Sequence, residues 1–255
     1  MITNGNENTK PHKDESAVIS YLLLRQLIGV LGLLLPFILT LGTYLFGNCS
    51  QLEPSISHYY YTIMHIVFVG TLCVLGGFLI TYKGTSSQRK LENTVSNLAG
   101  AFAFGVAIFP TGFGDFIGKG GSSCQFIELT TAAPIPEYIG WLHFSFAALL
   151  FVCFIIFCLK IFQEPDEKDK PIDAKKIRRN KIYKFCGIVI IVSILAIAAV
   201  TIYDSINGGN VFPYHVYIFE TTSLLAFGSS WLLKGSLNWP KSGSGLLRKT
   251  IQYFR

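Results

Sequence analysis

Six stretches of about 20 mostly apolar residues follow one another along this 255-residue chain. A helix needs about 20 such residues to cross the hydrocarbon core of a bilayer. We therefore predict an all-α polytopic membrane protein, a bundle of six transmembrane helices. The predicted spans cover residues 27–47, 56–82, 98–113, 138–162, 182–203 and 212–233. The first span extends back to residue 17 if Arg25 lies at the inner interface, and the third is short unless residues 91–97 continue it as helix.

The distribution of positive charge predicts the orientation. Every lysine and arginine except Lys119 falls in the N-terminal region, in the second or fourth loop and its flanks, or in the C-terminal tail. Basic residues mark cytoplasmic loops, so we predict that both termini lie in the cytoplasm. The chain then divides into a disordered cytoplasmic tail (residues 1–16), a six-helix transmembrane domain (17–235) and a basic cytoplasmic tail (236–255).

Composition agrees with a membrane protein. Only 14% of the residues are charged and 51% are hydrophobic, whereas a soluble domain carries about 25% charged residues. The net charge of +6 is gathered in the predicted cytoplasmic loops. We therefore expect membrane lipids as partners and no nucleic acid.

The predicted outer loops are acidic and contain two cysteines. An acidic vestibule raises the local concentration of cations, which predicts a small molecule or cation as a partner on the outer face. Acidic residues also simply fill the side that basic residues avoid, and both interpretations stay open. Cys49 and Cys124 are the only cysteines in these loops. In an oxidising compartment they could form a disulfide, and we predict this pair.

Imidazole, phenol and carboxyl groups gather at the outer ends of the second, fourth and sixth predicted spans. Polar side chains inside a membrane are costly and are candidates for function. His58 and His65 are seven residues apart in the second span, which predicts that they share one helix face. The predicted ligand-binding residues are His58, Tyr61, His143, His215 and Glu220.

Several chemistries fit this set of residues. The side chains of His58, His143, His215 and Glu220 could hold a divalent metal such as Zn²⁺, with water in an open position for hydrolysis. Two of the imidazoles could ligate one haem, and a chain of His and Glu could relay protons. Aromatic and His side chains near a membrane boundary also simply face headgroups. The motifs HExxH and GxSxG, a Walker loop and paired CxxC are all absent from the sequence.

Three segments carry a resemblance to a known group. They are "SISHYYYTIMHIVFVGTLCVLGGFLITYKG", "NLAGAFAFGVAIFPT" and "FETTSLLAFGSSWLLKG". They resemble a widespread group of uncharacterised bacterial six-span membrane proteins, over most of the chain from Arg25 to Gly235. The resemblance implies a multi-pass protein of the cell inner (plasma) membrane and supplies no activity. That group often has a charged pair where this chain has His65-Ile66.

The sequence favours one function and leaves two alternatives. We expect an outward-facing polar His/Tyr/Glu pocket that binds or passes a small molecule, an ion or a lipid headgroup. The first alternative is a metal-dependent intramembrane hydrolase that acts on lipid through the same residues. The second is a membrane scaffold with no active site.

Overall fold

The computed structural model describes residues 11–84, 89–112, 136–165, 174–208 and 212–236. These residues contain helices and no strand, which confirms the all-α class. In chain order the elements are α1 (Pro11–Phe46), the 3-10 helix η1 (Ile56–Tyr61), α2 (His65–Thr81), α3 (Arg89–Ile108), α5 (Glu137–Ile156), the π-helix η2 (Phe157–Ile161), α6 (Ala174–Asn207) and α7 (His215–Gly235).

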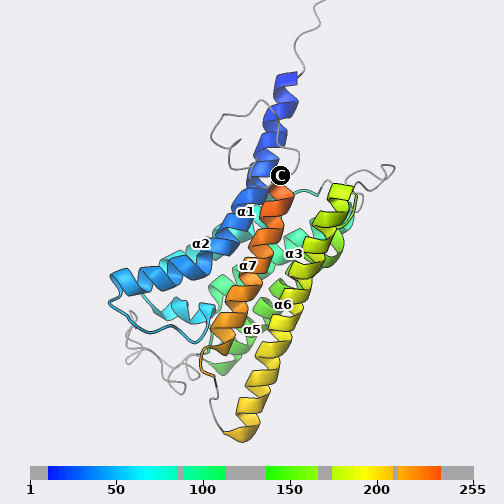
Figure 1. Cartoon of the computed structure of the whole chain (residues 1–255). Coiled ribbons are helices and arrows are strands. Elements are labelled where there is room, and N and C mark those ends of the chain that lie inside the picture. The colour runs from blue at the N-terminus through cyan, green and yellow to red at the C-terminus, as the bar shows by residue number, and fades with distance from the viewer. Residues whose placement is uncertain (1–10, 85–88, 113–135, 166–173, 209–211, 237–255) are drawn as a thin grey trace, which may run out of the picture.

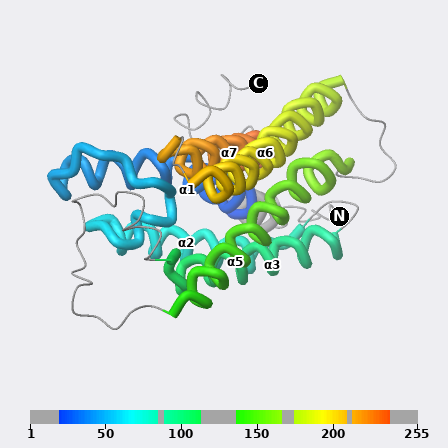
Figure 2. Tube along the Cα trace, turned by 90° about the horizontal axis from the view of Figure 1, so that it is seen from below, coloured from blue at the N-terminus to red at the C-terminus, as the bar shows by residue number. Residues whose placement is uncertain are grey.

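The long helices form a closed ring. Each packs against its neighbours in the chain, and α7 returns to pack against α1. Viewed as in Figure 2, α1, α7 and α6 make one row, and α2, α3 and α5 make the other. The start of α1 and the end of α7 lie at the same end of the bundle (Figure 1). At that end the Gln26 side chain Nε2 donates a hydrogen bond to the carbonyl of Gly235, at 3.5 Å.

Three helical segments are long and apolar enough to cross a membrane, namely Ser20–Phe46, Glu137–Ile161 and Ala174–Asn207. Each exposes large apolar side chains on its outer surface, such as Leu41 on α1, Val152 on α5 and Leu195 on α6. Large exposed apolar surfaces mark contact with a membrane or a partner, and together with the length of these helices they identify a membrane protein. The helices α2, α3 and α7 are shorter or more polar, so the six-span topology stays a prediction.

The second predicted span differs from the structure. Its outer part is the separate 3-10 helix Ile56–Tyr61, and α2 begins only at His65. His58 and His65 therefore lie in different elements, and the predicted shared helix face is wrong. The third helix begins at Arg89, so residues 91–97 do continue it, as a full-length third span requires. The first helix begins at Pro11, inside the segment predicted to be a tail.

Two glycine pairs bring neighbouring helices into close contact. A Cβ atom added to Gly228 of α7 would lie 2.6 Å from the carbonyl oxygen of Gly29 in α1. A Cβ atom added to Gly100 of α3 would lie 2.6 Å from the carbonyl oxygen of Gly76 in α2. Small residues at a crossing let two helix backbones approach closely in a membrane, so each pair sets the spacing between two helices of the same row.

Candidate functional site

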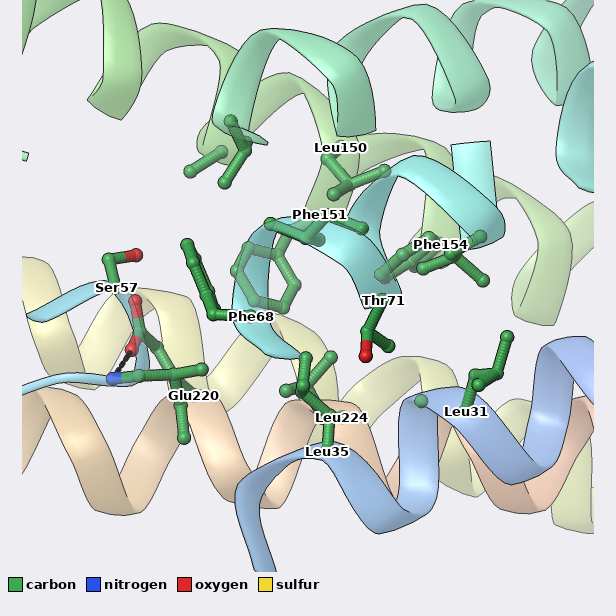
Figure 3. Close-up of a pocket in the computed structure, with 16 residues that line it drawn as sticks. Leu31, Leu35, Ser57, Phe68, Thr71, Leu150, Phe151, Phe154, Glu220 and Leu224 are labelled. Carbon is green, nitrogen blue, oxygen red and sulfur yellow. Dashed lines mark hydrogen bonds between the residues drawn. The ribbon is translucent and has the colours of Figure 1, made fainter. Parts of the chain in front are cut away.

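The ring of helices holds a narrow central cavity of about 50 Å³. Its lining comes from η1 and from every long helix except α6, and it is almost wholly apolar. The polar exceptions are Ser57, Thr71 and Glu220. Figure 3 shows Ser57 and Glu220 at one end of the cavity and Leu31 at the other. One water needs about 10–15 Å³ measured in this way, so the cavity has room for a few water molecules.

Glu220 carries the charge of this cavity. Its side-chain Oε2 accepts a hydrogen bond from the backbone N–H of Ile56, at 2.7 Å. Within the described part of the chain, no basic side chain forms an ion pair with it. An ionised carboxylate has about four acceptor positions, so most of its capacity is available to a ligand. A carboxylate held in an apolar cavity within a membrane protein is costly, which marks Glu220 as a functional candidate.

The 3-10 helix η1 closes the end of the cavity at which Glu220 lies. It is inserted into the bundle, with Tyr60 as its one partly exposed residue. Its start is fixed by α7, because the N–H of Tyr217 donates to the carbonyl of Pro54 at 3.0 Å. Its end is fixed by the hydroxyl of Tyr61, which donates to the carbonyl of Thr111 after α3. Tyr61, predicted to bind a ligand, thus holds this helix in place.

His143 connects α5 to the 3-10 helix η1. Its Nδ1 lies 2.6 Å from the carbonyl oxygen of Phe109, and its Nε2 lies 2.9 Å from the Oγ of Ser57. A carbonyl can only accept, so Nδ1 carries the hydrogen of the neutral ring and Nε2 is the acceptor. The hydroxyl of Ser57 therefore donates to His143.

His58, in η1, forms a hydrogen bond with the residue that caps this helix, since its Nδ1 lies 2.6 Å from the Oγ of Ser55. Three of the predicted residues thus form hydrogen bonds with three consecutive residues at the start of η1. His58, from η1 itself, bonds to Ser55, Glu220 of α7 bonds to Ile56, and His143 of α5 bonds to Ser57. Within the described residues, Glu220 and His143 are not bonded to each other and meet through this segment.

His215 lies apart from this convergence. Its Nδ1 is 2.6 Å from the carbonyl oxygen of Phe212, and its Nε2 is 3.3 Å from the Oγ1 of Thr201 in α6. In the part of the chain that the structure describes, no group of three or more His, Cys, Asp or Glu side chains is arranged to hold a metal ion. The geometry therefore gives no support to a metal held by His58, His143, His215 and Glu220.

The predicted outer loops lie largely outside the described residues. Cys124 is among the residues not described, so its pairing with Cys49 stays a prediction. The described cysteines within the predicted spans, Cys73, Cys153, Cys158 and Cys186, are free thiols. Of the predicted outer acidic residues, Glu53 is fully buried and so does not face an open vestibule.

A second buried polar cluster lies at the other end of the bundle and joins α1, α2 and α3. The Arg25 guanidinium donates to the hydroxyl oxygen of Tyr82 from Nη2 at 2.8 Å and from Nε at 3.1 Å. The Tyr82 hydroxyl donates to the Glu92 carboxylate, which lies 3.9 Å from Arg25 Nη2. This cluster was not predicted from the sequence, which left open whether residues 91–97, Glu92 among them, belong to the third helix. The signal available was the continuation of the third helix through residues 91–97.

Comparison with models of known protein families, with curated proteins and with solved structures finds no match to this chain. The central cavity and its residues are therefore the features that bear on function.

Proposed function

We propose that this protein is a membrane-embedded ion-binding protein whose central cavity binds or passes a proton or a small cation at Glu220. The observation that carries the proposal is the position of the Glu220 carboxylate. It lines the central cavity with one hydrogen bond, from Ile56, and without a basic partner in the described residues. A negative charge in that position favours a cation and disfavours an anion.

The size of the cavity selects among the ligands that the sequence left open. Pockets for organic ligands measure about 300–1,000 Å³, whereas this cavity measures about 50 Å³. A proton or a partly hydrated small cation fits this space, and an organic molecule or a lipid headgroup does not. The lipid hydrolase is disfavoured for the same reason, and also because His215 is separate from the other residues proposed for its metal.

Chemical labelling of Glu220 tests the proposal. Dicyclohexylcarbodiimide is an apolar reagent that modifies protonated carboxyl groups. In the full-length protein in detergent micelles, we expect mass spectrometry to find Glu220 modified at low pH, with the rate of modification falling as the pH rises. We expect Glu220→Gln to abolish the labelling.

Glu137→Gln is the matched control. Glu137 is an exposed carboxylate in the first turn of α5, away from the cavity, so its replacement should leave the labelling of Glu220 unchanged. Labelling of Glu220 that responds neither to pH nor to any added metal chloride would show that the site exchanges no ion, and would overturn the proposal.

A further inference from the structure

The tautomer of His143 decides which atoms of Ser57 remain for a ligand. The carbonyl of Phe109 fixes the hydrogen of the imidazole on Nδ1, so the Ser57 hydroxyl donates its one hydrogen to Nε2 of His143. The lone pairs of the Ser57 oxygen are then the part of the hydroxyl that remains to contact a ligand. His143 thus makes Ser57 an acceptor at the cavity.

Ser57 and Glu220 present these acceptors at the same end of the cavity. Both side chains line it, and Figure 3 shows Ser57 and Glu220 at the same end of the cavity. Their relative position is fixed by the backbone, because the N–H of Ile56, the residue before Ser57, donates to Glu220 at 2.7 Å. Hard cations are bound by oxygen ligands of this kind, both carboxylate and neutral oxygens.

The charge of the lining limits the cation to one positive charge. Among the described residues that line the cavity, Glu220 is the only ionisable one, and the imidazole of His143 contacts its neighbour in the lining, Ser57. A divalent ion would leave an uncompensated positive charge in an apolar cavity, which is costly. Sites for Ca²⁺ take 6–8 oxygen ligands, usually with several carboxylates, and the described lining offers a single carboxylate.

We infer that the cavity binds a small monovalent metal ion of the Na⁺ class, with Glu220 and Ser57 as its protein ligands and His143 as the residue that positions Ser57. This inference rests on the proposed function and names its ligand. The few water molecules for which the cavity has room complete the coordination. The ion and a proton compete for the same carboxylate, so binding of Na⁺ to protonated Glu220 releases one H⁺ and leaves the charge of the site unchanged.

Protection from the carbodiimide measures this competition. In the full-length protein at a fixed pH, we expect NaCl to slow the modification of Glu220, and choline chloride at equal ionic strength to have no effect. With each variant compared to its own rate of modification in the absence of Na⁺, we expect Ser57→Ala to raise the NaCl concentration for half-protection about tenfold. Ser57→Cys keeps the size of the side chain and replaces oxygen with sulfur, so it should weaken Na⁺ equally if the alanine variant folds poorly.

Ser145→Ala is the matched control, because Ser145 is an exposed hydroxyl on the same helix as His143. It should keep the half-protection concentration of the unmodified sequence. Protection by CaCl₂ at a lower concentration than by NaCl would overturn the monovalent assignment. Equal protection in both Ser57 variants and the unmodified sequence would overturn the role of Ser57. Labelling that depends on pH but is insensitive to NaCl would overturn the inference while leaving the proposed proton site intact.

Discussion

Arg25, Tyr82 and Glu92 form a buried ion pair that is bridged by a phenol. Arg25 is 5% exposed, and Tyr82 and Glu92 are fully buried. Removing one partner of a buried pair leaves an uncompensated charge, at a cost of about 3–5 kcal/mol. We therefore expect Arg25→Ala and Glu92→Ala each to lower the thermal unfolding midpoint of the protein in detergent by several degrees.

The double variant distinguishes the ion pair from simple loss of packing. Replacing both partners with apolar residues of similar size is often nearly neutral for a buried pair. We expect Arg25→Met combined with Glu92→Leu to be more stable than either alanine variant. If the double variant loses the sum of the two single losses, the two charges are not coupled and each residue acts through separate contacts.

The cost of polar groups in a membrane was enough to single out Glu220 and His143 from the sequence. It could not assign their partners, because a single sequence gives the depth of a residue in its span and not its direction around the helix axis. Ser57 was overlooked for this reason. A serine costs little to bury, so it carries no signal until the neighbour that fixes its hydrogen is known. His215 was included because it shares the depth of the others, although its partners are Phe212, just before α7, and Thr201 of α6.

Among the elements, η1 shows that an apolar stretch alone does not predict where a helix begins. The predicted span 56–82 is apolar enough for one helix, but Ser55 caps a 3-10 helix by accepting from the N–H of His58 at 3.3 Å. Thr62 then accepts from the N–H of Met64 at 3.1 Å. Local hydrogen bonds from Ser and Thr compete with helical ones, so the chain turns before α2 begins. This break puts Ile56 and Ser57 over the cavity.

The glycine crossings give a prediction at the scale of helix pairs. A methyl group at Gly228 would lie 2.6 Å from the Gly29 carbonyl oxygen, which is backbone and cannot move aside cheaply. Overpacking of this kind costs about 1–3 kcal/mol. We expect Gly228→Ala to lower the thermal unfolding midpoint, and Gly100→Ala to do the same at the α2–α3 crossing.

Gly70→Ala is the control for both variants. Gly70 lies in α2 and a Cβ atom there would meet nothing within 4 Å. Alanine is favoured over glycine in a helix by about 0.5–1 kcal/mol, so this variant should keep or raise the midpoint. A Gly228→Ala protein as stable as the Gly70→Ala protein would show that the α1–α7 contact tolerates a wider separation than the structure has.

At the scale of the whole molecule, the ring explains how the less apolar helices can share the membrane. α7 packs between α1 and α6, and both neighbours are long and apolar enough to span. α3 packs between α2 and α5. We therefore expect α7 to lie at the same depth as its two neighbours. The polar groups of the less apolar helices face the bundle, as Glu92 of α3 and Glu220 of α7 do, and each finds a partner there.

This packing and the charge distribution lead to one prediction for the topology. The chain reverses direction at each connection of the ring, so the start of α1 and the end of α7 share one end of the bundle (Figure 1). Every basic residue except Lys119 belongs to the termini and loops predicted at that end, and because basic residues mark cytoplasmic loops, we predict that this end faces the cytoplasm. We expect reporter fusions at Lys90, Lys175 and Arg255 to report the cytoplasm, and fusions at Gln51, Gly121 and Asn207 to report the outer side. A single clear reversal would mean that one helix of the ring does not cross. In that case Glu220, in the last helix, could no longer be assigned to the outer half of the membrane.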